Sequence, residues 1–523
     1  MSVWRSPVLY ISILLVVVVA GLLSAPFLVD WNRYRATVEE TGRQLTGRDV
    51  SVTGDISARL FPWPHIRLEG VRVANVPGTL ISDVVRAEVV EARMLLGSLM
   101  GGRVEVSNIR IVKPVFSFER LDTSEVNWWL TPKLLHAAPV EAERVSIKDL
   151  EIVDGTVFIS DTRRGGTAAF NGVDMSVSAQ SLLGPWKAKG QLVQSGRPFS
   201  IGISTAAYKA GEPFGFTFRF SPVEGPGLVY TFDGAYAAAS DEPLSGTITA
   251  EPYVAASGKS DSESKVRALV FKADIGFRED HALLRNIEIA PVDREHAGNI
   301  LTGTAAIDLQ ERISVMADLH SPNYDLDAML GSTGREVLKS GAFLDGLANF
   351  LEVLPGTLDG RVRLDIANLV VGGAKLEGTK LEAEISEGGL TLHELALTMP
   401  GQTKSRLVGK FIAGGEQPLL TGDLTIESAN AREFFSWLMP EWQQAIAAAW
   451  TGARGKLDLT ARLDHQPQSL KLTDARLGLD EAKAEGSLSM VGGPESQTTL
   501  RLAVDRLDVD RYLSEDAAVG DLK

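Results

Sequence analysis

The sequence predicts a mainly β protein in which an N-terminal transmembrane helix is followed by an elongated, repetitive antiparallel β-sheet groove with a few short helices. Three observations carry this prediction. Residues 8–29 form one uncharged stretch, apolar and polar residues alternate from residue 50 almost to the C-terminus, and the second half of the chain repeats itself. Alternation with a period of two is typical of half-buried strands, and internal repeats are typical of arrays that grow by adding units.

The uncharged stretch lies between Arg5 and Asp30. A helix of this length, with a rise of ~1.5 Å per residue, covers roughly 33 Å and crosses a hydrocarbon core of about 30 Å. We therefore expect a short tail and a membrane anchor over residues 1–29. The apolar side chains of the anchor include Val8, Leu15, Val19, Leu22 and Val29. A cleaved secretory signal is the alternative, since residues 23–25 include the small residues of a cleavage site, although the apolar run is longer than the core of a usual signal.

The composition argues against a nucleic-acid-binding protein and against a protein that depends on cysteine chemistry. The 523 residues include 52 Lys and Arg against 67 Asp and Glu, a net charge of −15, and no cysteine. A protein that follows nucleic-acid phosphates needs clustered positive charge, and no long basic run is present, so we expect no nucleic-acid partner. Without cysteine the chain has no disulfide, thiolate nucleophile or thiolate metal ligand.

The elements after the anchor can be placed in order. Asp30 opens a predicted helix, and Gly47 just past its end suits a left-handed C-cap. Alternation starts at Val50, and we expect the apolar residues of the early strands on one dry side of the sheet. These residues are Val50, Val52, Ile56, Val104, Val106, Ile109 and Ile111. The same alternation recurs in later segments such as residues 214–220, with turns rich in Gly and Pro between them.

The chain divides at a polar Gly/Ser stretch. We expect an N-terminal β domain over residues 30–256, a loop or linker over 257–265, and a β-repeat region with short helices over 266–523. Three copies of a repeat of roughly forty residues lie in the last region. The copies begin at Leu284, Leu392 and Leu472, contain Gly303, Gly409 and Gly486, and end at helix starts near Asp325, Asn430 and Asp508.

The helix that begins near Asn430 carries tryptophans. Asn430 suits an N-cap, with Glu433 three residues later. The helix and the residues after it contain Trp437, Trp442 and Trp450. Core packing is the simpler interpretation of these side chains. The alternative is that they line or plug a lipid path, or touch a membrane interface.

The sequence carries no established catalytic or cofactor motif. It has no P-loop, no Gly-x-Ser-x-Gly elbow and no Gly-x-Gly-x-x-Gly after a strand. His393 and Glu394 begin like a zinc-protease motif, but Leu397 stands where the second histidine is required. His281 and His296 meet no established ligand spacing. We expect no enzyme activity, no metal and no cofactor.

Several motifs of the first 200 residues carry a resemblance. They are Gly47-Arg48-Asp49-Val50 continuing to Asp55-Ile56, then Arg59-Leu60-Phe61-Pro62-Trp63-Pro64, Leu68-Glu69-Gly70-Val71-Arg72-Val73, Asn127-Trp128, Asn171-Gly172-Val173, Gly184-Pro185 and Gly190. With the anchor, these motifs resemble the AsmA family. The resemblance implies an inner-membrane-anchored periplasmic protein of Gram-negative envelope biogenesis, related to bridge-like proteins that conduct phospholipids along a β groove toward the outer membrane.

Two classes of function follow from the alternation and the resemblance. The first is a conduit whose apolar groove holds phospholipid acyl chains, in an inner-membrane, single-pass protein with most of its chain in the periplasm. The second is a non-catalytic periplasmic scaffold for outer-membrane assembly proteins. Alternation fits both classes, because it shows that one face of the sheet is shielded from water but not whether lipid or protein shields it. The cations after the span, Arg33, Arg35, Arg43 and Arg48, favour the opposite orientation, but long domains translocate largely regardless of charge.

Overall fold

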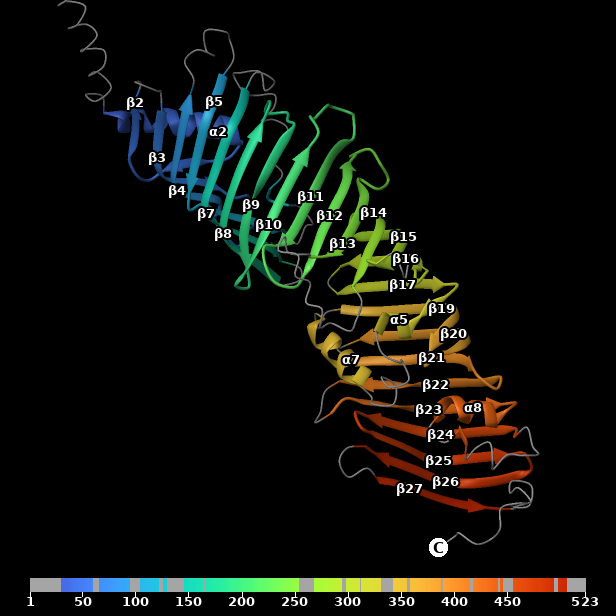
Figure 1. The fold of residues 1–523 in the computed structure, drawn as a ribbon. Coiled ribbons are helices and arrows are strands. Elements are labelled where there is room, and N and C mark those ends of the chain that lie inside the picture. Colours follow the sequence, from blue (N-terminus) through green and yellow to red (C-terminus); the bar gives the residue numbers. More distant parts are fainter. Residues whose placement is uncertain are drawn as a thin grey trace, which may run out of the picture. The chain divides into compact units, whose positions relative to one another are not determined.

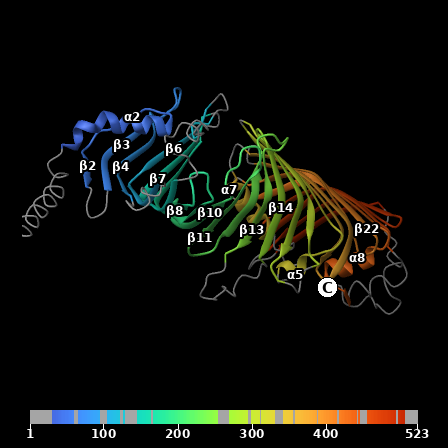
Figure 2. The ribbon, with the colours of Figure 1, turned by 90° about the horizontal axis from the view of Figure 1, so that it is seen from above.

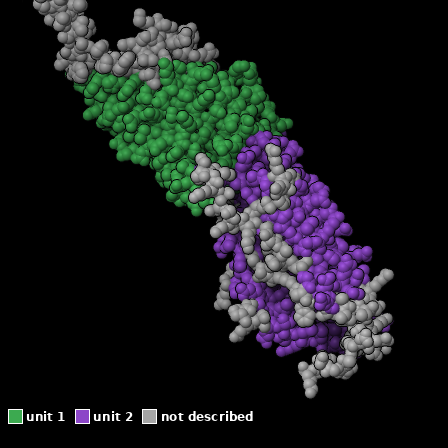
Figure 3. Space-filling model, viewed as in Figure 1, with its two compact units in different colours: residues 1–246 green, residues 247–523 purple. Residues whose placement is uncertain are grey.

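The computed structural model describes residues 30–59, 65–94, 104–121, 126–128, 145–162, 166–253, 268–293, 298–310, 312–330, 342–354, 358–386, 389–413, 417–440, 443–444, 455–492 and 497–505. These residues form 27 strands and a few helices, which confirms the mainly β class (Figure 1). The chain divides into two compact units, residues 1–246 and 247–523 (Figure 3). Within the described ranges no helix is both long and apolar enough to cross a membrane. The expected anchor of residues 1–29 and the expected loop of residues 257–265 lie outside these ranges.

The described part of unit 1 begins at residue 30 with two short helices and continues as strands. The helices are the 3-10 helix η2 (Trp31–Tyr34) and α2 (Arg35–Thr46). The strands are β1 (Val50–Val52), β2 (Ile56–Arg59), β3 (His65–Ala74), β4 (Asp83–Met94), β5 (Val104–Val112), β6 (Val115–Arg120), β7 (Val145–Asp161), β8 (Gly166–Ala179), β9 (Trp186–Gln194), β10 (Arg197–Thr205), β11 (Phe214–Pro222) and β12 (Leu228–Tyr236). The boundary between the units falls within β13 (Leu244–Pro252).

The described residues of unit 2 form three helices in addition to its strands. The helices are α5 (Leu326–Leu330), α7 (Ala342–Val353) and α8 (Ala431–Leu438). The strands are β14 (Leu269–Arg278), β15 (His281–Pro291), β16 (Leu301–Leu309), β17 (Ile313–Ser321), β18 (Tyr324–Asp325), β19 (Leu358–Val371), β20 (Ala374–Ser386), β21 (Gly389–Met399), β22 (Thr403–Ile412), β23 (Leu419–Ser428), β24 (Leu457–Gln466), β25 (Ser469–Leu479), β26 (Ala482–Val491) and β27 (Gln497–Val504).

The strand pairing corrects the expectation of a purely antiparallel sheet. Most neighbours are antiparallel, but β7 pairs in parallel with β5 and β6, and β19 pairs in parallel with β17 and β18. Parallel neighbours need a crossover connection, and the chain between β17 and β19 contains α5 and α7. The sheet is therefore mixed. Alternation along one strand is the same for both pairings, so the sequence pattern does not distinguish them.

Helix α2 covers the first edge of the sheet (Figure 2). The 3-10 helix η2 before it begins after Asp30, whose carboxylate accepts a hydrogen bond from the Asn32 N–H at 3.2 Å. Helix α2 ends at Gly47, which has a φ of 68° as its C-cap role requires. The Arg35 guanidinium donates to the carbonyl oxygens of Val52 and Gly54, and the Glu39 carboxylate accepts from the Val52 N–H. Side chains of the N-terminal helices therefore satisfy backbone groups of an edge that would otherwise be open to a further strand.

The three repeat copies share one backbone feature, a bulge that lies opposite a glycine of the next strand. The copies consist of β15–β17, β21–β23 and β25–β27. In each copy the first strand contains a bulge, and the glycine of the second strand, Gly303, Gly409 or Gly486, pairs with a residue at the edge of that bulge. A Cβ atom on these glycines would lie 2.0, 2.1 and 1.9 Å from a carbonyl oxygen of the third strand. A bulge followed by a close backbone approach bends the strands at the same place in every copy.

Two helices pack on the apolar side of the strands in unit 2. Leu344 and Leu351 of α7 are 0% and 4% exposed and pack with Phe411 near one end of β21–β23. Ala431 and Phe434 of α8 pack with Leu457 near the other end of these strands. Between the two helices lies a cluster of leucines from β20–β25. Burying each of the larger side chains stabilises the fold by roughly 1.5–3 kcal/mol.

Candidate functional site

One face of unit 1 carries an unbroken apolar row. Directly opposite residues on neighbouring strands point to the same side of a sheet, so the register of each pair follows a face from strand to strand. The row, each member opposite the next, is Ile56, Leu68, Val90, Ile111, Ile152, Met175, Gly190, Ile201, Phe220 and Tyr230. It crosses from β2 to β12, which at ~4.8 Å between neighbouring strands is about 43 Å along the sheet.

A second row runs beside the first on the same face. Its members are Ala58, Ile66, Ala92, Ile109, Leu150, Val177, Ala188, Ile203, Phe218 and Phe232. A shorter third row contains Ile147, Ala179 and Trp186. The apolar face is therefore a band several side chains wide. We call it the apolar band; it consists of these three rows.

The seven candidate groove residues lie on β1, β2 and β5. Ile56, Ile109 and Ile111 belong to the rows, and the backbones of Val104 and Val106 pair with those of Val145 and Ile147. Val50 and Val52 lie opposite Val73 and Val71. Their surroundings differ. Val52 and Ile56 are 3% and 4% exposed and form ordinary core beneath the N-terminal helices, whereas Val50, Ile109 and Ile111 are half-buried.

Aromatic side chains gather at the far end of the apolar band. Phe199 and Phe220 stack with ring centroids 4.6 Å apart, and the rings of Phe216 and Phe232 lie 5.2 Å apart. These rings are half-buried. The alternation of residues 214–220 indicates this strand, but the grouping with Phe199 and Phe232 depends on the strand register, which sequence reasoning missed.

The opposite face of the same strands is charged. Arg67 lies opposite Glu91, which lies opposite Arg110. The Arg67 guanidinium donates to the carboxylates of Glu69 and Glu91, and these hydrogen bonds raise the pKa of Arg67. Arg110 lies 3.9 Å from Glu151. The two faces of the sheet therefore differ in chemistry along the whole early part of unit 1.

A buried polar cluster holds the loops next to these strands. The Asn127 side chain is fully buried; its amide donates to the Ser117 carbonyl at 2.7 Å and its oxygen accepts from the Glu119 N–H at 2.8 Å. The Arg48 guanidinium donates to the Asn127 carbonyl, and burial lowers the pKa of Arg48. The Glu119 carboxylate accepts from the Leu80 N–H. This cluster explains the Gly47-Arg48 and Asn127-Trp128 motifs as structural elements.

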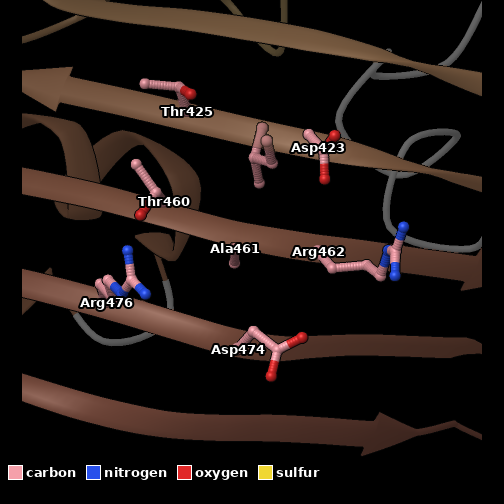
Figure 4. A pocket seen from close by; sticks show the side chains of 8 residues that line it. Asp423, Thr425, Thr460, Ala461, Arg462, Asp474 and Arg476 are labelled. Carbon is pink, nitrogen blue, oxygen red and sulfur yellow. The ribbon is translucent and has the colours of Figure 1, made fainter.

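A pocket of unit 2 lies on a polar surface (Figure 4). Its volume is about 430 Å³, and the side chains that line it come from β23, β24 and β25 beside the bulge of β25. They include Asp423, Thr425, Thr460, Arg462, Asp474 and Arg476. Leu424, between Asp423 and Thr425, packs with the leucine cluster on the other face. Leu424 and Ala461, which alternate with these polar residues along β23 and β24, also line the pocket.

Of the three tryptophans expected at this helix, only Trp437 lies in the described residues. Trp437 lies in α8, with its ring 6.5 Å from the ring of Phe434, and packs against the cluster of Ala431, Phe434 and Leu457. Trp442 and Trp450 lie outside the described residues. The interpretation of these side chains as core is therefore supported for the one tryptophan that can be placed.

The described residues offer no metal centre. No group of three His, Asp or Glu side chains is placed to hold an ion within the described ranges. His281 lies 3.4 Å from Asp308, and His393 lies 3.1 Å from Glu384, each on an exposed strand surface. The hydrogen bonds that Glu384 makes with Arg361 and then His393 lower its pKa, which keeps this carboxylate charged.

Comparison with known proteins gives one match. Residues 5–261 match the model of the AsmA family, which confirms the resemblance indicated by the motifs of the first strands. The matched region contains the helices η2 and α2, the strands β1–β12 and therefore the apolar band. No curated protein and no solved structure matches the chain.

Proposed function

Residues 5–261 belong to the AsmA family, and from this premise we propose that the protein is an envelope-biogenesis protein that conducts phospholipids with their acyl chains on the apolar band. Family membership and the long β-sheet support an envelope-associated protein. The observation that carries the conduit is the unbroken pair of apolar rows from β2 to β12. The role proposed is transport and not catalysis.

The physical basis is the transfer of acyl chains between two apolar surroundings. Each buried CH₂ group stabilises a bound lipid by about 0.8 kcal/mol. The free-energy cost of moving an acyl chain out of a bilayer is therefore small only where a continuous apolar protein surface replaces the bilayer. Half-buried side chains such as Ile109, Ile203 and Phe218 leave part of their surface for such contacts. Headgroups remain in water beside the strand ends.

The proposed setting follows from the sequence. Residues 8–29 anchor the chain once in the inner membrane, the remainder lies in the periplasm, and phospholipid and outer-membrane assembly proteins are the partners. Family membership supports this setting, because the matched region includes the anchor.

One observation favours a scaffold as the second candidate. Protein already covers parts of the apolar side: Val52 and Ile56 are 3% and 4% exposed, and α7 buries Leu344 completely. If other protein segments cover the rest, the strands form ordinary cores and the protein acts by binding assembly proteins.

Photo-crosslinking separates the two candidates. A photo-reactive amino acid at Ile109, Ile203 or Phe218 tests the apolar band, and the next residues in the chain, Arg110, Ser204 and Arg219, are matched controls on the other face. We expect phospholipid adducts, identified by mass spectrometry, at the first three positions and not at the controls. Protein adducts without lipid at the apolar positions support the scaffold. Lipid adducts at neither face, or equally at both, contradict the conduit.

A further inference from the structure

The strand β27 of unit 2 has an open edge. Within the described ranges β27 pairs with β26 alone, in one antiparallel register along its whole length. Figure 1 shows no other described strand beside it. All of its residues are exposed. An edge of this kind presents a row of unpaired backbone N–H and C=O groups, which can pair with a further strand.

A hydrogen bond at the end of β27 shows which of its backbone groups face the open edge. The Asp505 N–H donates to the Lys483 carbonyl at 2.9 Å, so the backbone of this residue faces β26. Backbone groups alternate in direction along an antiparallel strand, and the register of β26 with β27 does not shift. The backbone groups of Leu500, Leu502 and Val504 therefore face the open edge.

The sequence of β27 carries little of the protection that edge strands usually have. Charged side chains, proline and bulges keep natural edges from pairing with other chains. The strand holds one charged residue, Arg501, and no proline. Leu500, Leu502 and Val504 are 60%, 42% and 45% exposed. This edge is therefore suited to pairing with a strand of similar character.

The apolar side of unit 2 becomes exposed toward this edge. One row of directly opposite residues passes from Leu463 through Leu472 and Leu488 to Leu500. Leu463 is 8% exposed and belongs to the leucine cluster, and Leu472 and Leu488 are half-buried. Leu500 is the most exposed member of the row. A further strand with apolar residues on the same side would continue the row and cover its exposed end.

The first edge of unit 1 is already closed to a further strand. Side chains of η2 and α2 bond the backbone groups of Val52, Gly54 and Ile56 there. A β27 strand from another molecule would find these groups occupied, so molecules cannot join head to tail through this edge. Pairing between two copies of β27 remains. Two identical edges related by a two-fold axis form a closed dimer and not a filament.

The sequence of β27 is complementary to itself in one antiparallel register. A two-fold axis perpendicular to the sheet makes two copies of β27 antiparallel and keeps their apolar sides together. Leu500, Leu502 and Val504 all pair with one another only when Leu502 lies on the axis. Leu502 then faces its own copy, and Leu500 faces Val504 of the second copy. Because these are the residues whose backbone groups face the open edge, each pair can exchange two hydrogen bonds.

The charged residues favour the same register. With Leu502 on the axis, Asp505 lies diagonal to Arg501 of the second copy. Opposite charges at such positions attract one another. The neighbouring register, with Leu500 opposite Leu502, would instead place Arg501 opposite its own copy, and like charges directly opposite destabilise a sheet. Apolar pairing and charge therefore select one register.

We propose that the protein forms a homodimer in which β27 pairs antiparallel with β27 of a second copy, with Leu502 on the two-fold axis. This inference goes beyond the proposed function and does not depend on it. The pairing satisfies the open backbone groups of both copies and continues the row that ends at Leu500 into the second molecule. The other occupants of the edge would be a strand of a different protein or residues 506–523 of the same chain, and the test separates these from the dimer.

Light scattering of the full chain in detergent measures the oligomeric state, and the wild type should be a dimer. Leu502→Pro removes an N–H that faces the open edge and keeps the hydrogen bonds to β26, so it should weaken dimerisation about tenfold or more. Leu502→Lys should do the same, because it places two like charges together on the axis. Leu80→Lys is the matched control, since Leu80 is 76% exposed in unit 1 and should leave the dimer unchanged. The thermal midpoint of each variant reports whether the fold is kept.

Disulfide formation tests the register, because the chain has no cysteine of its own. Directly opposite Cα atoms of a hydrogen-bonded pair are about 5.5 Å apart, which a disulfide can bridge. Leu502→Cys alone should therefore form a covalent dimer under mild oxidation. Leu500→Cys alone should not, since its own copy would lie four residues away, roughly 13 Å along the strand. The double variant Leu500→Cys/Val504→Cys should form the covalent dimer again.

Three results would overturn the inference. A monomeric wild type would show that residues 506–523 or solvent cover the edge, and a monomer that carries a second protein in fixed proportion would assign the edge to that protein. A dimer that Leu502→Pro and Leu502→Lys both leave unchanged would place the contact elsewhere. Equal crosslinking of Leu500→Cys and Leu502→Cys would show that the two strands do not pair in the proposed register.

Discussion

Gly409 of β22 and Gly422 of β23 lie directly opposite one another, and neither position has room for a side chain. A Cβ atom on Gly409 would lie 2.1 Å from the Thr421 carbonyl oxygen, and one on Gly422 would lie 2.3 Å from the Val408 carbonyl oxygen. The two backbones approach here more closely than any other residue type allows. Gly303 and Gly486 meet the same contact in the other repeat copies.

Replacing Gly409 by alanine should therefore strain β22 and β23. We expect Gly409→Ala to lower the free energy of unfolding by about 1–3 kcal/mol, because the Cβ atom collides with backbone that cannot move alone. Hydrogen exchange of these strands and the thermal midpoint of the full chain measure the effect. Gly360→Ala is the control, since its Cβ atom would meet Ile385 at an ordinary 3.7 Å. Equal stability of the two variants would contradict the close approach.

The contact of α8 with the sheet depends on Phe434, which is 3% exposed. Phe434→Ala should destabilise unit 2 by about 3–5 kcal/mol, because the lost ring leaves a cavity beside Ala431 and Leu457. Phe350→Ala on α7 is the control, since Phe350 is 55% exposed and should change stability by less than about 0.5 kcal/mol. Limited proteolysis between β23 and β24 reports the loosening, and unchanged cleavage would rule out the packing role of α8.

The buried polar cluster predicts that removing the side-chain amide of Asn127 strongly lowers the free energy of unfolding. Asn127→Ala leaves the Glu119 N–H and the Ser117 carbonyl without their partner inside the protein. Because unsatisfied buried groups are expensive, we expect a loss of about 2–3 kcal/mol in the free energy of unfolding. Asn171→Ala, at an exposed position of β8, should change it by less than about 0.5 kcal/mol. A thermal midpoint for Asn127→Ala equal to that of the control would show that the cluster does not hold these loops.

The ion pairs on the polar face of unit 2 predict a dependence of stability on pH. Hydrogen bonds from Arg361 and then His393 lower the pKa of Glu384 in the folded chain. A carboxyl whose folded pKa is depressed stabilises the fold above its unfolded pKa of about 4.3, and this contribution is lost as the pH falls through the folded value. The difference in thermal midpoint between the wild type and Glu384→Gln should therefore shrink as the pH is lowered through this range. A difference that grows toward acid would reverse the predicted sign.

The expected anchor predicts one orientation. Alkaline phosphatase joined after Lys523 should be active, and a fluorescent protein that matures only in the cytoplasm should be dark there, because residues 30–523 are expected in the periplasm. A fusion at Ser2 serves as the control on the other side of the membrane. The reverse pattern would agree with the cations after the span and overturn the predicted orientation.

The alternation of the sequence was enough to predict the mainly β class of the fold. Ile109 and Ile111 belong to neighbouring rows of one face, because the direction of a side chain is set by the local backbone of its own strand. The helix end at Gly47 was predictable for the same reason, since a left-handed C-cap is a property of one residue.

Contacts between distant residues were decided by the tertiary structure alone. The parallel pairs of β5 with β7 and β17 with β19, and the burial of Ile56 beneath the N-terminal helices, depend on which strands become neighbours and in what register. The period of a strand records that a side is dry or wet, but it holds no information about the partner strand. A shift of register by one residue would leave the sequence pattern unchanged and place every side chain against a different neighbour.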